Sequence, residues 1–150
     1  MEQLQPTPGT RRRDQGFTLV EVILVTAIIA VVASIAIPGL AQARVSANET
    51  SAIGTLKTIG VSNFQYRTRF GRFAADINDL WSSGYLDPGI AAPFKAGYNF
   101  NYVGTASTRF EATAAPTDPG ASGNRHFFVD QSGLLRQSYA GPATVADDPL

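Results

Sequence analysis

The chain has no cysteine and only one histidine, His126, among its 150 residues. Without cysteine there is no disulfide bond, no thiolate zinc site and no cysteine nucleophile. Histidine is the side chain that most often transfers protons near neutral pH, so one histidine leaves little material for acid–base catalysis. The sequence also shows no serine–histidine–acid order and no phosphate-binding glycine loop. We therefore expect a protein that is not an enzyme and that has no cofactor, no metal site and no small-molecule substrate.

Net charge is also absent, because 12 basic residues balance 12 acidic ones. No global field then favours nucleic acid or an anionic membrane surface. One long segment almost lacks charge as well: residues 17–37 are FTLVEVILVTAIIAVVASIAI, and Glu21 is their one charged residue. As a helix, this segment would span about 30 Å, the thickness of the hydrocarbon core of a bilayer.

Three arginines, Arg11, Arg12 and Arg13, stand just before this apolar segment. The positive-inside rule places the N-terminus in the cytoplasm and the residues after the segment outside. A secretory signal peptide is one alternative, but its apolar core is usually about 7–15 residues and leads to a small-x-small cleavage site. A buried helix of a globular protein is another, but such helices rarely continue this far without charge. We favour membrane insertion.

Pro38 and Gly39 follow the apolar segment, and they predict a helix kink. Apolar residues then recur at helical spacing as far as Phe70, and Gly71 is suited to end the helix. We predict one long helix whose first part lies in the membrane and whose second part packs on a soluble head. The residues expected to face the head form two neighbouring stripes: Val45, Ala52, Ile59 and Tyr66, and beside them Ile53, Leu56, Gly60 and Phe64.

The remaining sequence changes from helical to strand periodicity. Asp76 is expected to cap a short helix that ends at Gly84. Alternating patterns predict strands at 98–103 and 109–116, a loop at 117–124, and a hairpin at 125–138 that turns at Gly133; the tail, 141–150, is expected to be loosely ordered. The expected fold is α+β, with one long N-terminal helix packed on a small antiparallel sheet of three to four strands.

The segment GFTLVEV at 16–22, between a basic leader and an apolar helix, resembles the N-terminal motif of type IV pilins and type II secretion pseudopilins. Pro38 also falls where many of these proteins break their membrane helix. FGRFAADINDLWSSGYL at 70–86 and NRHFFVDQSGLLR at 124–136 are similar to the loop after the long helix and to the last hairpin of such subunits. The chain lacks the cysteine pair of many pilins, which leaves its branch of the family open.

The resemblance implies how the precursor would be processed. A prepilin peptidase would cut between Gly16 and Phe17, and the new amine of Phe17 would be methylated. Residues 1–16 would then be a leader that is removed, 17–38 the transmembrane and filament-core helix, and 39–150 a pilin-like globular head.

The resemblance also implies partners and a location. The precursor would cross the bacterial inner membrane once, with a cytoplasmic N-terminus, and meet an assembly platform there. Mature subunits would then self-assemble into a cell-surface pilus or a periplasmic pseudopilus. We favour a type IV pilin over a pseudopilin. A membrane-tethered binding or adhesion domain, whose helix is only an anchor, is the alternative from a different class.

Physical chemistry gives Glu21 a role in such an assembly. Glycine leaves the scissile backbone open to a protease, and the cut creates an α-amino group on Phe17 that is mostly protonated at neutral pH. This cation would lie about one helical turn from Glu21, where it would favour the ionised carboxylate. We expect an assembly ion pair between Glu21 and the Phe17 amine of its own or a neighbouring subunit. The alternative is that Glu21 extends to the membrane interface.

Two further segments have alternative interpretations. Residues 63–73, NFQYRTRFGRF, mix arginines with aromatic residues, as in single-strand nucleic-acid sites. We favour a helix end with aromatic residues in the core, so DNA is the less favoured partner. Asp118, Asp130, Asp147 and Asp148 could offer oxygen ligands to calcium. No run of them has loop-like ligand spacing, and Asp130 is more simply a turn residue.

Overall fold

A computed structural model describes residues 16–105 and 108–150 of the chain. Most of the predicted leader, including its three arginines, therefore lies outside the described residues. The chain divides into two compact units: the first ends at Pro38, and the second is Gly39–Leu150. Each unit is described by itself.

Helix α1 (Leu19–Phe70) has 52 residues and belongs to both units. In the first unit almost all of its side chains are exposed, including every leucine, isoleucine and valine. By length and composition α1 can cross a membrane. Pro38 lies inside the helix, and a kink at Pro38 and Gly39 stays a prediction.

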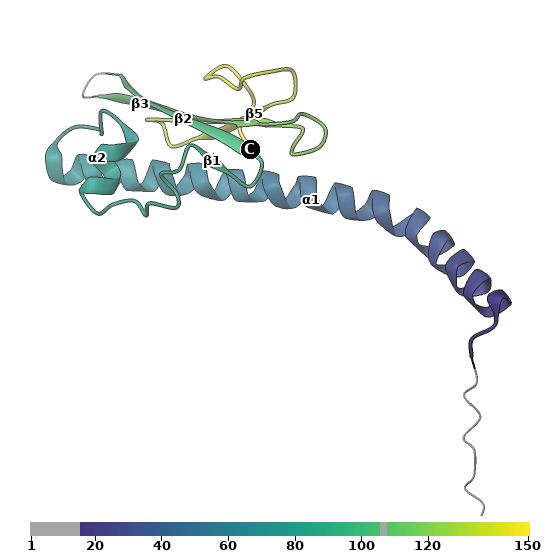
Figure 1. Cartoon of the computed structure of the whole chain (residues 1–150). Helices are drawn as coiled ribbons and strands as arrows, with labels where there is room; N and C mark the ends of the chain where they lie inside the picture. The colour runs from purple at the N-terminus through teal and green to yellow at the C-terminus, as the bar shows by residue number, and fades with distance from the viewer. Residues whose placement is uncertain (1–15, 106–107) are drawn as a thin grey trace, which may run out of the picture. The chain divides into compact units, whose positions relative to one another are not determined.

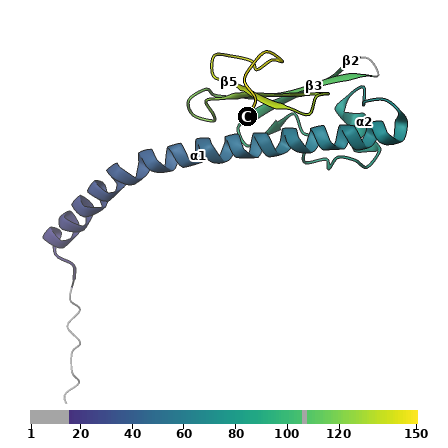
Figure 2. The same ribbon diagram turned by 180° about the vertical axis from the view of Figure 1, so that it is seen from behind.

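The second unit contains a five-stranded antiparallel sheet in the order β1-β2-β3-β4-β5. Figures 1 and 2 both show this sheet lying along the second half of α1, with the short helix α2 (Ile77–Ser82) near the end of α1. The strands are β1 (Phe94–Lys95), β2 (Tyr98–Thr105), β3 (Arg109–Pro116), β4 (His126–Asp130) and β5 (Leu135–Ser138). The α+β fold is confirmed. The sheet has one strand more than the predicted three to four. The additional strand is β1, which has only two residues and is too short to show the alternation of buried and exposed side chains.

The core of the second unit lies between α1 and the facing side of the sheet. Four residues of α1 spaced seven apart, Val45, Ala52, Ile59 and Tyr66, are all buried, as predicted. Of the neighbouring stripe, Leu56 and Gly60 are buried, Ile53 is half-buried, and Phe64 stays partly exposed. Strand residues of alternate positions cover this helix face, among them Tyr98, Phe110, Ala112, Phe127 and Val129.

The residues predicted to end the long helix, to cap the short helix and to form the last turn are confirmed in these roles. Gly71 has a φ of 70°, and its N–H donates to the carbonyl of Arg67 at 2.8 Å, which ends α1. The carboxylate of Asp76 accepts from the N–H of Asp79 at 2.9 Å and so caps α2. Gly133, with a φ of 75°, closes the turn between β4 and β5.

The prediction of a loosely ordered tail is wrong. The N–H of Gln137 donates to the carbonyl of Asp148 at 3.0 Å, and the N–H of Leu150 donates to the carbonyl of Leu135 at 2.9 Å. The tail therefore pairs with β5, whose outer edge would otherwise leave backbone groups without partners. Hydrophobic periodicity does not reveal this, because the tail contributes mainly backbone groups.

Candidate functional site

The segment around the predicted cleavage bond lies open to solvent. Gly16, Phe17 and Thr18 precede α1 without regular structure and are exposed, and the side chain of Phe17 is 89% exposed. A Cβ atom added to Gly16 would meet no atom within 4 Å. The backbone between Gly16 and Phe17 is therefore accessible within the described chain.

Thr18 and Glu21 cap the start of α1 reciprocally. The N–H of Glu21 donates to Oγ1 of Thr18 at 3.2 Å, while the carboxylate of Glu21 accepts from the N–H of Thr18 at 2.9 Å and from its hydroxyl at 2.8 Å. This is a capping box, in which two backbone donors at the helix start are satisfied by side chains. The spacing Thr-x-x-Glu in the sequence is the local signal for this cap, which we did not predict.

The capping box bears on the role of Glu21. In the uncut chain one oxygen of this carboxylate already accepts two hydrogen bonds, so the residue stabilises the helix before any amine exists. Glu21 thus has two separable properties, its hydrogen bonds to Thr18 and its charge. The expected ion pair with the Phe17 amine concerns the second property and stays a prediction.

Comparison with protein-family models gives one match: residues 11–37 fit the prokaryotic N-terminal methylation motif. This motif is the hallmark of type IV pilins and pseudopilins. The chain carries this methylation motif. The match includes Gly16, Phe17 and Glu21, and it ends just before Pro38. Comparison with curated proteins gives no match. Proteins with this motif are structural, and the motif and the apolar helix are consistent with a membrane-anchored precursor.

In the second unit, a buried ion pair fastens α1 to the loop before β4. Glu49 is 6% exposed, and its carboxylate accepts from Nε of Arg125 at 2.8 Å and from the N–H of Asn124 at 2.8 Å. Nη2 of Arg125 lies 2.7 Å from the same carboxylate, and Nη1 donates to Gln137 on β5 at 2.8 Å. Glu49 is thus joined to residues about 75 positions away in the sequence. No local sequence pattern indicates that Glu49 is buried and paired.

A second buried polar residue, Asn63, fastens α1 to the sheet and to the chain after α1. Its Oδ1 accepts from the hydroxyl of Tyr102 at 2.9 Å and from the N–H of Ala74 at 3.4 Å, and its Nδ2 donates to the carbonyl of Ile59 at 3.2 Å. The carbonyl oxygen of Ala74 lies 2.8 Å from the same Tyr102 hydroxyl, so this oxygen and Asn63 Oδ1 share the one hydroxyl proton. Burial raises the pKa of the Tyr102 hydroxyl, which therefore stays neutral across the physiological range.

The arginines of residues 63–73 lie against aromatic rings of the head. The guanidinium of Arg67 lies 4.9 Å from the ring centre of Phe73, and that of Arg72 lies 5.7 Å from the ring centre of Tyr66. Both rings are buried. This arrangement agrees with the favoured interpretation, a helix end with aromatic residues in the core.

The structure gives a turn role to one of the aspartates weighed as calcium ligands. Oδ1 of Asp130 accepts from the N–H of Ser132 at 2.8 Å, so Asp130 is a turn residue. Across residues 16–105 and 108–150, no three histidine or acidic side chains gather as a metal site. His126 is the first residue of β4.

Proposed function

We propose that the chain is a type IV pilin-like structural subunit. Its leader, 1–16, is removed by a prepilin peptidase, and the new N-terminal Phe17 is methylated. The transmembrane helix, 17–38, then becomes part of a filament core, and the head, 39–150, forms the filament surface. It is not an enzyme.

The distribution of apolar surface supports this proposal best. In the second unit the sheet covers one face of α1, and a hydrophobic core forms between them. Between residues 17 and 37, by contrast, large apolar side chains stand exposed all along the helix. Such a surface requires lipid or other apolar helices around it. A membrane covers it in the precursor, and neighbouring subunits would cover it in a filament.

The methylation motif supports the processing step. The positive charge that cleavage creates on Phe17 explains why the step would matter for assembly. The precursor would cross the inner membrane with a cytoplasmic N-terminus, where the leader meets the peptidase. Cleavage would add a cation next to an acid that the helix already holds in place. In a filament, a Glu21 carboxylate paired with a neighbour's Phe17 amine would fix the axial register, as one buried polar pair does in a coiled coil.

The mature N-terminus tests the processing step. In mass spectra of purified filaments we expect the chain to begin at a methylated Phe17. A Gly16→Val variant should accumulate uncut, because a branched side chain next to the bond hinders access to the backbone. Gly16→Ala, with a much smaller side chain, is the matched control and should be cut to a greater extent. An intact Met1 in assembled filaments would refute the proposal.

Two substitutions separate the charge of Glu21 from its capping role. Glu21→Gln keeps the capping geometry, since glutamine also completes a capping box, but it removes the charge. Thr18→Val removes the cap, at a cost of about 1 kcal/mol, and keeps the charge. We expect Glu21→Gln to insert and fold normally but to give few filaments, and Thr18→Val to assemble nearly as wild type. The measurement is filament yield relative to membrane-inserted protein. Normal yield from Glu21→Gln would refute the ion pair.

Imaging distinguishes a type IV pilus from a type II secretion pseudopilus, the alternative assembly. Cells that lack the protein should lose surface pili and keep secretion. Loss of secretion with pili intact would assign the chain to the pseudopilins instead.

A further inference from the structure

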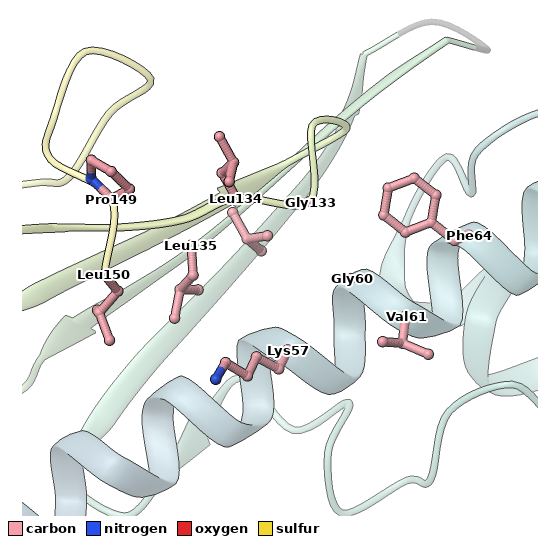
Figure 3. Close-up of a pocket in the computed structure, with 10 residues that line it drawn as sticks. Lys57, Gly60, Val61, Phe64, Gly133, Leu134, Leu135, Pro149 and Leu150 are labelled. Atoms are coloured by element: carbon pink, nitrogen blue, oxygen red, sulfur yellow. The ribbon is translucent and has the colours of Figure 1, made fainter.

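An apolar groove runs along the head between α1 and the hairpin of β4 and β5. Its volume is about 360 Å³. Figure 3 shows its two sides, with Lys57, Val61 and Phe64 on the helix and Leu134, Leu135 and Leu150 opposite them. Val61 and Leu134 are about half exposed, so this apolar surface is left open by the chain's own folding.

Among the described residues that line the groove, only Lys57 has a charged side chain. Within the described part of the chain, no carboxylate lies within salt-bridge distance of its ammonium group. An apolar hollow with a single cation at its side selects a partner that combines an apolar side chain with a nearby carboxylate.

The same head presents that combination on helix α2. Leu80 of this helix is fully buried, and the next residue, Trp81, points away from the core and is 49% exposed. Trp81 and the exposed Asp87 line the same shallow hollow, and the Asp87 carboxylate accepts from the N–H of Gly89 at 2.7 Å. Tryptophan is the residue most enriched at the energetic centres of protein interfaces.

We infer that Trp81 of one subunit docks into the groove of the next, with Asp87 beside Lys57. The inference rests on the filament proposed above and adds a head-to-head contact to it. The groove and the Trp81 hollow share no residue, so the contact is heterologous and can repeat from subunit to subunit without closing. One side chain in one groove buries far less than the roughly 1,200 Å² of a stable interface. The contact would therefore form only where the N-terminal helices already hold subunits together.

The absence of cysteine allows a direct crosslinking test on full-length filaments. Ser83 is exposed and follows Trp81 by two residues, and Leu134 lines the groove. A Ser83→Cys/Leu134→Cys chain should therefore give a ladder of disulfide-linked oligomers on mild oxidation. The matched control is Ser83→Cys/Glu111→Cys. Glu111 is exposed and alternates with the buried Phe110 and Ala112, so it faces away from α1 and should give no ladder.

Charge reversal in the crosslinking chain tests the proposed pairing. Lys57→Glu should abolish the ladder, and adding Asp87→Lys should restore it, because the two opposite charges are then exchanged. Filaments without a ladder, or a ladder unchanged by Lys57→Glu, would overturn this docking while leaving the proposed function intact. Failure of the wild-type chain to form filaments at all would overturn both.

Discussion

Removal of the buried carboxylate of Glu49 should destabilise the head more than any other single loss of charge in it. Glu49 on α1 receives three donor groups: Nε and Nη2 of Arg125 and the N–H of Asn124, all within 2.8 Å. The side chain of Arg125 is 25% exposed, whereas that of Glu49 is 8% exposed. The substitution Glu49→Ala would therefore leave a half-buried cation and a backbone donor without their shared acceptor.

The magnitude follows from these partners. Breaking a buried pair by removing one member costs about 3–5 kcal/mol. Because Arg125 can still reach water and keeps its hydrogen bond to Gln137, the cost should lie near the lower end of this range. We expect a loss of about 3 kcal/mol in the free energy of unfolding. For a domain of this size such a loss lowers the melting temperature by roughly 10–20 °C.

Urea unfolding of the head, followed by circular dichroism, measures this loss. The control is Glu111→Ala, an exposed carboxylate on β3, which should change stability by less than about 0.5 kcal/mol. A Glu49→Ala/Arg125→Met double variant should recover part of the loss, because it removes both charges together. A Glu49→Ala head as stable as the control would refute our account of this ion pair.

Three further predictions concern the head. Gly123→Ala would place a Cβ against the hydroxyl of the buried Tyr98 and should cost about 3 kcal/mol in urea unfolding, whereas Gly54→Ala, with no atom within 4 Å, should cost nothing. Burial, and then the charge of Glu49, raise the pKa of Tyr98 from 10.0 to about 12. The unfolded chain therefore loses this proton at lower pH than the folded head, and the free energy of unfolding should fall between pH 10 and 12. A free energy of unfolding that stays constant over this pH range would contradict the prediction. Residues 40–150 expressed alone should sediment as a folded monomer, and stable filaments without detergent would contradict the role given to residues 17–37.

Periodicity and turn chemistry predicted most elements of the second unit. The seven-residue spacing of Val45, Ala52, Ile59 and Tyr66 is a property of any helix with one buried face, so it identified the face that packs on the sheet. The cap at Asp76 and the turn at Gly133 follow from backbone geometry within a few residues. The two residues of β1 could not be predicted, since a strand this short has no period.

The N-terminal motif was also a property of the sequence alone. A short basic leader, a glycine, an apolar segment and one acid are local features, and the match at residues 11–37 depends on no tertiary contact. The capping box of Thr18 and Glu21 is equally local, because its two residues are three positions apart.

Tertiary structure decided the rest, where partners come from distant parts of the chain. Glu49 and Asn63 look like ordinary polar residues of a helix surface, but folding buries them against donors about 75 and 39 positions away. The tail gained its order from the unpaired edge of β5, and the groove beside Lys57 exists because Leu134 and Leu150 come to lie opposite α1. Sequence periodicity identifies which face of a helix is buried, but only the folded chain determines which groups meet that face.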